Sequence, residues 1–349
     1  MLRAFERSDV PAILELWNRR WGNLFPLDEA LWVQQTIGDP LHFRPDLARV
    51  AQVTGKAGMA YVEGQRIVGA VSLKTPPNPV TGGSWVGQNP KNAWISFVLV
   101  EPGREADLGP KLLEYALKAL RREGFEWVQY GGDPSHFFPG VPREDSGLAE
   151  LLQGYGFEKR KTEGKDRLEQ DLIRDLSDYQ LPEEARAALQ ASGLADDAQR
   201  NTRLETKSCT REDVPGLLDF LAENFPGRWL YDTQERLKVE PTPADILVLK
   251  GQGRIWGFCH LYHAGSRRIG PGIYWRKALG PGYGGLGPIG VSRDLRGRGL
   301  GFALLCYGVQ RLKELGVQRM VIDWTTLADF YGKIGFKPWR SYLAYSRKL

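Results

Sequence analysis

The chain has 349 residues, enough for two domains of average size, and its 42% hydrophobic and 26% charged residues are typical of a soluble globular protein. No run approaches the roughly 18 apolar residues of a membrane-spanning helix, and the charged first residues argue against a signal peptide, so we expect a cytoplasmic protein with no membrane partner. The net charge of +5 suits an anionic ligand, but the basic residues are scattered, so we expect no nucleic-acid partner.

Hydrophobic periodicity predicts the same order of elements twice along the chain. The first half is predicted to hold a helical pair, two strands, a long helix, a strand, a short helix and a closing strand, the first six over 9–36, 66–74, 94–100, 108–122, 125–130 and 147–154. The second half is predicted to repeat this order over 213–238, 245–249, 255–262, 287–291, 299–315, 319–324 and 327–334. A strand, a long helix and another strand imply a parallel crossover inside an otherwise mixed sheet.

Short sequence motifs recur in the same order in both halves. RSDVP at 7–11 returns as REDVP at 211–215, RIVG at 66–69 returns as RIWG at 254–257, and two later matches follow. The offsets of 204, 188, 192 and 179 residues drift slowly, which indicates two copies of one α/β unit. We predict an N-terminal domain over 1–171, a linker with a short helix over 172–200 and a C-terminal domain over 201–349.

The cysteines and histidines of the second half give no metal motif. Cys209, Cys259 and Cys306 are widely spaced, which argues against a disulfide framework and a thiolate metal site. His260 and His263 are three residues apart on a predicted strand, so their side chains should point to opposite faces. We therefore expect no metal.

A glycine-rich turn joins the strand ending at Val291 to the long helix of the second half. Gly297, Gly299 and Gly301 fall within five residues, and glycine lets the backbone approach a ligand closely. The first turn of the following helix presents unpaired N–H groups and the positive end of its dipole. Because neither G-x-G-x-x-G nor GxxxxGK[ST] is present, the turn predicts a pyrophosphate cradle of another kind.

This turn and a later motif resemble the GNAT superfamily of acyl-CoA N-acyltransferases. Arg296-x-x-Gly299-x-Gly301 matches the family's (Arg/Gln)-x-x-Gly-x-(Gly/Ala) signature, and Phe330-Tyr331-x-x-x-Gly335-Phe336 resembles its F-Y-x-x-x-G-F ending. The resemblance covers both halves and implies an α/β class with two tandem GNAT folds, each a mixed sheet with a parallel crossover and splayed central strands. It also implies acetyl-CoA as cosubstrate, bound by Ile289, Val291, Arg296, Gly297, Arg298, Gly299, Leu300 and Gly301.

The family's transfer reaction assigns roles to residues near these motifs. The resemblance implies that the Val291 N–H polarises the thioester carbonyl and that Tyr331 protonates the leaving thiolate, although Tyr331 could instead be a packing residue. Asp323 lies in the apolar strand MVIDW, where a charge needs a function or a partner, so it is either the general base or a structural aspartate. Many members carry an asparagine seven residues before the tyrosine, where this chain has Trp324.

The first half lacks these groups at the matching positions. Gly299 corresponds to Asp107, and a carboxylate there would repel a pyrophosphate. Tyr331 corresponds to Leu152. We therefore expect a degenerate first domain and a single active site in the second.

These observations predict an acetyl-CoA-dependent N-acetyltransferase for the primary amine of a small polar substrate. A protein or peptide N-acetyltransferase and a non-catalytic acetyl-CoA sensor are the alternatives. The tandem arrangement resembles mycothiol synthases and glucosaminide N-acetyltransferases, and aromatic loops around Trp275 and Phe137–Phe138 favour an amino sugar, with Trp275 and Trp324 as substrate contacts. The tandem repeat mimics a GNAT dimer, which is compatible with a monomer.

Overall fold

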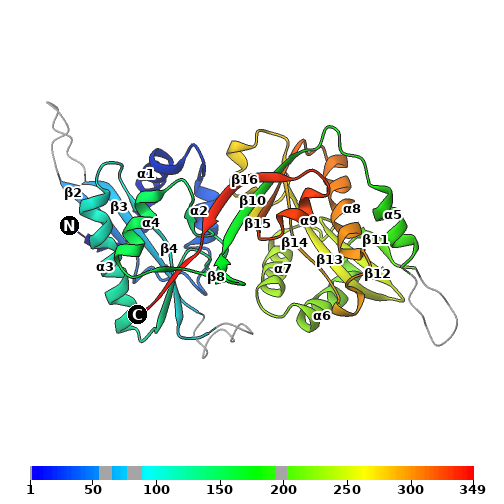
Figure 1. Ribbon diagram of the computed structural model, residues 1–349, viewed down its shortest axis with the longest axis horizontal. Helices are drawn as coiled ribbons and strands as arrows, with labels where there is room; N and C mark the ends of the chain where they lie inside the picture. Colours follow the sequence, from blue (N-terminus) through cyan, green and yellow to red (C-terminus); the bar gives the residue numbers. More distant parts are fainter. Residues whose placement is uncertain (1, 55–64, 77–88, 193–202) are drawn as a thin grey trace. The chain divides into compact units, whose positions relative to one another are not determined.

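The computed structural model describes residues 2–54, 65–76, 89–192 and 203–349, which divide into two compact units (Figure 1). The first unit comprises the described part of 1–170 together with Arg340–Leu349, and the second comprises that of 171–339. This division differs from the expected one, because the end of the chain belongs to the first unit and the segment from Asp171, expected to be a linker, belongs to the second. Residues 193–200 of that linker lie outside the described residues.

The first unit is built on a mixed sheet of order β1-β2-β3-β4-β5-β17-β7, in which β4 and β5 are parallel. A short hairpin of β8 and β9 stands apart from it. The elements are β1 Leu2–Ala4, η1 Arg7–Asp9, α1 Val10–Trp21, α2 Glu29–Gln35, β2 Arg49–Thr54, β3 Gln65–Lys74, β4 Asn92–Val100, α3 Glu105–Arg122, β5 Trp127–Tyr130, β6 Val141–Pro142, α4 Ser146–Gly154, β7 Glu158–Lys159, β8 Lys161–Thr162, β9 Lys165–Asp166 and β17 Tyr345–Lys348.

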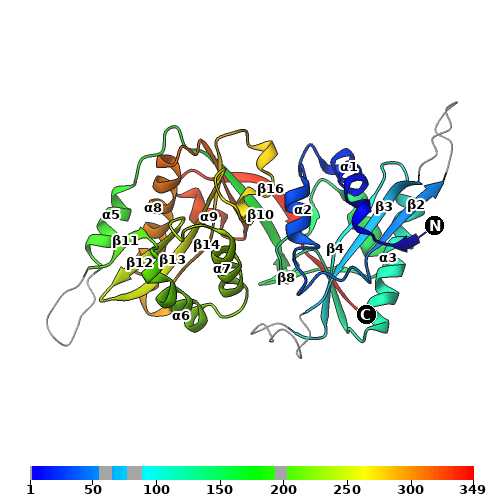
Figure 2. The same ribbon diagram turned by 180° about the vertical axis from the view of Figure 1, so that it is seen from behind.

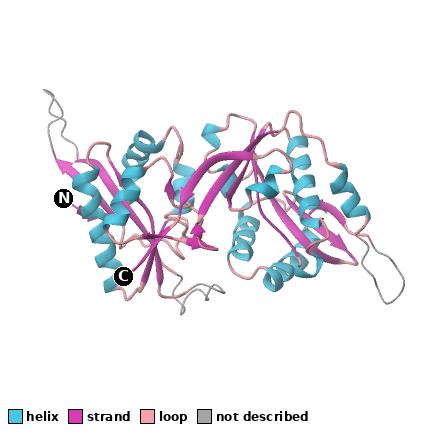
Figure 3. Ribbon diagram, in the orientation of Figure 1, coloured by secondary structure: helices cyan, strands magenta, loops and turns pink. Residues whose placement is uncertain are grey.

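The second sheet has the order β11-β12-β13-β14-β15-β10-β16-β6, in which β14 and β15 are parallel. Its elements are β10 Leu168–Asp175, α5 Glu183–Gln190, β11 Glu205–Ser208, η2 Arg211–Asp213, α6 Val214–Asn224, α7 Arg228–Val239, β12 Ile246–Gly251, β13 Arg254–His263, η3 Pro271–Ile273, η4 Arg276–Ala278, β14 Tyr283–Val291, η5 Arg293–Leu295, α8 Leu300–Glu314, β15 Arg319–Thr325, α9 Ala328–Gly332 and β16 Lys337–Leu343. A parallel pair joined by a long helix in each sheet confirms the predicted fold class (Figure 3).

The two units repeat each other in backbone register. Gly69 of β3 faces Val100 of β4, and Gly257 of β13 faces Val291 of β14. Each ladder also has one register shift at the matching place, between Ser72 and Leu73 and between Cys259 and Leu261. The structure thus confirms the internal repeat that the sequence offsets predict.

Side chains alternate across the second sheet between two cores, one on each face. Val248 of β12 packs in a cluster with Leu217 and Phe220 of α6, whereas Leu247 packs in a cluster with Leu304 of α8. This alternation follows from the two-residue period of a strand. It places α6 and α8 on opposite faces of the sheet, as both views of the ribbon show (Figures 1 and 2).

β14 begins at Tyr283, four residues earlier than the glycine-rich sequence suggests. A Cβ on Gly284 would lie 2.7 Å from a Val317 side-chain atom, and one on Gly285 would lie 2.6 Å from the backbone of Gly272. The glycines are therefore needed for close approach within a strand rather than for a turn. Among the described residues, no helix is long and apolar enough to cross a membrane.

Candidate active site

The central strands β14 and β15 separate halfway along their length. Their parallel pairing runs from Tyr283↔Arg319 to Gly285↔Val321 and goes no further in the described structure. Gly287 then adopts φ +137°, a conformation that favours glycine, at the register shift of the neighbouring ladder. Beyond this point β14 pairs only with β13 among the described residues, which leaves one edge of its last residues open.

The backbone groups of Val291 face this open edge. The Ser292 N–H donates to the Trp256 carbonyl oxygen at 2.8 Å, so Ser292 faces β13. Backbone groups of successive strand residues point to opposite sides, so the N–H groups of Val291 and Ile289 point away from β13. Both residues are only half-buried. The open edge thus offers hydrogen bonds to an extended ligand and a donor to a carbonyl oxygen.

The turn after β14 has the geometry of an anion cradle. Gly297 and Gly299 adopt φ +77° and +74°, and Gly299 caps the N-terminus of α8. The first helical bond runs from the Ala303 N–H to the Gly299 carbonyl at 2.9 Å, so the N–H groups of Leu300 and Gly301 have no acceptor within the helix. Arg296 and Arg298 are exposed beside the turn. These residues fit the diphosphate of a CoA thioester.

Tyr331 lies on α9 in the core between the sheet and α8, with 7% of its surface exposed. Its ring packs against Phe330 and Phe336, with centroids 5.1 and 6.4 Å away. Burial, and next the charge of Asp323, hold the pKa of its hydroxyl well above the ordinary value. The hydroxyl therefore stays protonated at neutral pH and is able to donate a proton. The packing contacts and the acid role are compatible.

Asp323 lies at the end of β15 and faces the place where β14 separates from it. A Cβ built on Gly287 would lie 3.5 Å from the Asp323 Oδ1 atom. Burial, and next the charge of Asp171, raise the pKa of the Asp323 carboxyl to about 7. A carboxyl with a pKa near neutrality is matched to the work of a general base.

Asp171 joins this site from β10, a segment that the sequence assigned to the domain boundary. It is 2% exposed, and its Oδ1 accepts a hydrogen bond from the Trp324 N–H at 3.2 Å. Trp324 has φ +42°, which is strained for a bulky residue and costs on the order of 1–3 kcal/mol. The hydrogen bond therefore holds a strained backbone next to Asp323. The segment LEQDLI at 168–173 has two carboxylates among its six residues, so the sequence does not single out Asp171.

The aromatic residues expected to wall a substrate pocket are mostly buried. Phe137 and Phe138 are fully buried and pack against Trp17, so the expectation that they wall a pocket is wrong. Trp275 is 4% exposed and contacts Tyr274 edge to face at 6.3 Å, which leaves little surface for a substrate. Trp324 is half-buried. Periodicity does not distinguish a ring that fills a gap under a loop from one that lines a pocket.

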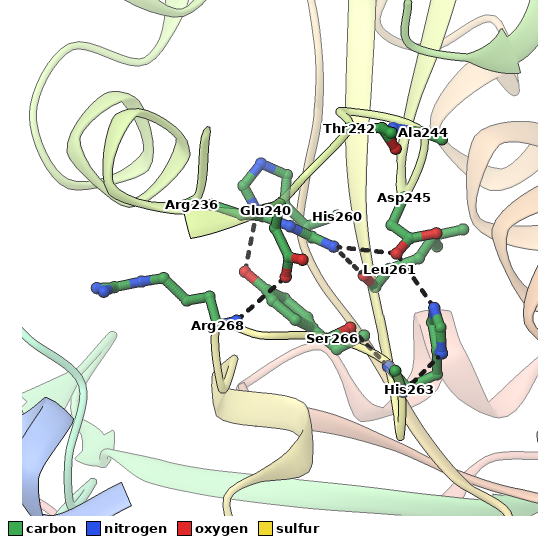
Figure 4. A network of polar contacts seen from close by, with 12 residues as sticks. Arg236, Glu240, Thr242, Ala244, Asp245, His260, Leu261, His263, Ser266 and Arg268 are labelled. Atoms are coloured by element: carbon green, nitrogen blue, oxygen red, sulfur yellow. Dashed lines mark hydrogen bonds and ion pairs between the residues drawn. The ribbon is translucent and has the colours of Figure 1, made fainter. Parts of the chain in front are cut away.

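A polar network lies between α7 and β13 on the face that carries α6 (Figure 4). His260 is fully buried between the Thr233 hydroxyl at 3.0 Å and the Tyr262 hydroxyl at 3.1 Å, and burial holds its pKa well below the ordinary value. His263 contacts Asp245 at 3.1 Å instead. The two imidazoles thus have separate partners, and no group of potential metal ligands is found among the described residues.

An ion pair on α7 adds a carboxylate, that of Asp232, whose charge acts on Tyr274 in the loop before β14. Arg228 and Asp232 are 2.9 Å apart, one helical turn from each other. Burial, and next the charge of Asp232, hold the pKa of the Tyr274 hydroxyl well above its ordinary value, and the charges of Arg228, Arg268 and Asp323 also act on it. No motif in the sequence predicts this grouping.

The matching region of the first unit has a different surface. α3 begins at Glu105, so helix occupies the place of the glycine turn. Asp107 is exposed and forms ion pairs with Arg104 at 3.0 Å and with Lys111. Leu152 is fully buried at the position of Tyr331.

Two comparisons with the sequences of known proteins found matches. Residues 214–336 match the Acetyltransferase (GNAT) family. A mycothiol acetyltransferase from Arthrobacter sp. (strain FB24) is 25% identical over 297 residues, which cover 75% of this chain and 83% of that protein.

Solved structures with similar folds span the whole chain. The glucosamine N-acetyltransferase region of a fungal multi-domain GH3 β-N-acetylglucosaminidase superimposes with a TM-score of 0.78 at 24% identity, covering 99% of this chain and 38% of that longer chain. A GCN5-related N-acetyltransferase from Sphaerobacter thermophilus has a TM-score of 0.61 at 16% identity, covering 100% of this chain and 95% of that one. A tandem GNAT protein from the clavulanic acid biosynthesis pathway has a TM-score of 0.57 at 16% identity, covering 100% and 98%.

Proposed function

We propose that the second unit, in which residues 214–336 match the Acetyltransferase (GNAT) family, transfers an acetyl group from acetyl-CoA to the primary amine of a small polar substrate, an amino sugar. The tandem fold shared with solved GNAT structures supports this proposal. The observation that carries this proposal is the position of the Asp323 carboxyl, which lies beside the open edge of β14. Its pKa is raised to about 7. One unit would supply the donor cradle, the base and the acid.

Each step of the proposed transfer is assigned to a residue or turn of the second unit. The turn Arg296–Gly301 holds the diphosphate, and the Val291 N–H donates to the thioester carbonyl oxygen as negative charge develops there. Asp323 takes a proton from the substrate ammonium, directly or through water, and the free amine attacks the carbonyl carbon. The new C–N bond forms as the C–S bond breaks, and Tyr331 gives its proton to the leaving thiolate. The second proton that the nitrogen loses on becoming an amide returns to the Tyr331 oxygen through water.

The acceptor side supports an amine that arrives as a cation. The charge of Asp171 raises the pKa of Asp323, so two carboxyl groups lie close together in this part of the site. Carboxylates that are partly withdrawn from water attract an ammonium group strongly. The fungal neighbour is named as a glucosamine N-acetyltransferase region, and the Arthrobacter relative is named as a mycothiol acetyltransferase. The name of the fungal neighbour supports an amino-sugar acceptor here, and that of the Arthrobacter relative supports acetyl transfer.

The acceptor assignment is tested by thiol release from acetyl-CoA with a panel of amines at matched concentration. Glucosamine and simple glucosaminides should give the highest kcat/KM, followed by polyamines and aminoglycosides, with a basic peptide last. A preference for the peptide would contradict the amino-sugar acceptor. Absence of acetylation with every amine would contradict the catalytic proposal itself.

We expect one acetyl-CoA to bind per chain. Gly299→Asp should abolish binding, because an aspartate brings a negative charge to the diphosphate and a Cβ to a residue at φ +74°. Calorimetric titration measures both the stoichiometry and the loss. Asp107→Asn is the matched control in the first unit and should leave the titration unchanged. A second site of similar affinity would contradict the expectation.

Asp171→Asn should move the acidic limb of the pH profile of kcat/KM to lower pH. The Asp171 charge raises the pKa of Asp323, so its removal lowers that pKa and keeps the base ionised in more acidic solution. The asparagine oxygen still accepts the Trp324 N–H, which preserves the backbone. Profiles from about pH 5.5 to 9 measure the shift. Asp175→Asn, at the exposed end of β10, is the control, and equal profiles for the wild type and Asp171→Asn would contradict the coupling.

A further inference from the structure

A segment of the second unit follows α8 from its C-terminal end to its N-terminal cap. Near the C-terminal end of α8, the Lys313 ammonium donates to the carbonyl oxygens of Ser177 and Tyr179, at 3.0 and 2.7 Å. Farther along α8, the Tyr179 hydroxyl donates to the Cys306 carbonyl oxygen at 2.7 Å. We call residues 176–190 the strap, and its last part, α5, lies beside α8 in both views (Figures 1 and 2).

The α5 part of the strap packs against the first turns of α8. Ala185 is fully buried in the core that contains Ala303 and Leu304, and Ala188 packs against the same core. A Cβ built on Gly299 would lie 3.3 Å from the Ala188 Cβ, so Ala188 lies directly beside the residue that caps α8. The strap therefore ends against the proposed acetyl-CoA turn.

The end of α5 also contacts the residues on either side of this turn. Leu189 packs against a cluster that contains Leu295, which precedes the turn, and Leu300, which follows the Gly299 cap. Just beyond α5, the Ser192 hydroxyl accepts the Leu204 N–H at 3.1 Å, which ties the end of the helix to the start of β11. Apolar side chains of α5 thus support the turn from one side while the turn itself stays exposed.

The turn needs support from outside because its own residues restrict it little. Gly297 and Gly299 have no Cβ, so an unsupported turn has more conformations available than one built of other residues. A site that its ligand must order loses affinity, whereas a site already held in the bound conformation does not. The N–H groups of Leu300 and Gly301 are useful to a diphosphate only when the turn holds them in place.

We propose that the strap holds the glycine turn in its ligand-binding conformation and that Ala188 is the positioning residue at the point of contact. The inference rests on the proposed function, because it takes acetyl-CoA as the ligand of this turn. Ala188 acts through Gly299 and touches no reacting atom. It should therefore affect the affinity for acetyl-CoA and leave the chemical step unchanged, which is the kinetic result of losing uniform binding.

The first test is Ala188→Leu in the full-length protein, because the additional carbon atoms would press on Gly299. Calorimetric titration should show a Kd for acetyl-CoA raised about tenfold or more, and kcat at saturating acetyl-CoA with the best amine of the panel should stay within about twofold of the wild type. Ala187→Leu is the matched control, since Ala187 is exposed at the adjacent position of α5. Its Kd should equal that of the wild type.

The second test is Ala188→Gly, which removes the contact without adding bulk and should raise the Kd severalfold. Ala187→Gly loses the same helix propensity without losing the contact, so its Kd should remain that of the wild type. Unchanged Kd in both Ala188 variants, equal weakening by the Ala187 variants, or a loss of kcat with unchanged Kd would each overturn the positioning role. A wild-type protein that does not bind acetyl-CoA would contradict the proposed function as well, so the two failures are distinguishable.

Discussion

Asp323→Asn is expected to lower kcat on the order of 10²- to 10⁴-fold at about pH 8, the range typical for loss of a general base. At that pH the wild-type carboxyl, with its pKa of about 7, is ionised and able to take the ammonium proton. Below pH 7 the wild type loses this base, so its kcat should fall with decreasing pH. The variant should lack this limb, and the difference between the two enzymes should narrow toward pH 5.5 or so.

The same substitution should raise stability above neutral pH. The folded state holds the pKa of Asp323 at about 7, above the 3.8 of an ordinary aspartate, so folding favours the protonated form. The ionised group therefore lowers stability progressively as pH rises from about 4 to 7, by at most about 4 kcal/mol. Thermal unfolding at pH 8 should show a higher Tm for Asp323→Asn than for the wild type, and the two should agree near pH 4.

Asp329→Asn is the control for both measurements, because Asp329 is exposed on α9 in the same segment. It should change neither kcat nor Tm. Wild-type turnover in Asp323→Asn at every pH would remove Asp323 from the mechanism. An unchanged Tm at pH 8 would show instead that its carboxylate is well solvated or paired in the folded state.

The sequence was most informative where local pattern alone determines structure. The glycine turn from Arg296 to Gly301 forms as predicted because positive φ at Gly297 and Gly299 is a local requirement that few other residues meet. The long helices formed within a few residues of their predicted bounds, because their apolar stripes have a clear helical period.

Pairing between distant strands was not predictable. β17, at the end of the chain, lies between β5 and β7 in the first sheet, and β10 lies between β15 and β16 in the second. Alternation of apolar residues shows which face of a strand is buried, but it does not identify the strand beside it. For this reason Asp171, which reaches the site through β10, was assigned to the domain boundary. The burial of Trp275 was missed because loop composition does not show what a ring packs against.

Tyr331→Phe is expected to lower kcat on the order of 10²-fold while the Kd of acetyl-CoA stays unchanged. The hydroxyl is held protonated by burial and by Asp323, so removing it removes a proton donor for the thiolate. Phenylalanine keeps the ring contacts with Phe330 and Phe336, so the core should remain intact. Steady-state kinetics and calorimetric titration with acetyl-CoA separate turnover from binding.

The leaving group provides a sharper test of this role. A thiolate with a lower pKa needs less help from an acid, so an acetyl thioester with a more acidic thiol should restore part of the activity of Tyr331→Phe but change the wild type little. Tyr307→Phe is the control. Tyr307 lies on α8 and packs against the same core, and it has no role in the proposed reaction. Equal losses in Tyr331→Phe with both thioesters would show that the hydroxyl supports packing or positioning rather than proton transfer. Wild-type turnover in the variant would leave Tyr331 as a core residue, and the thiolate would then depart with a proton from water.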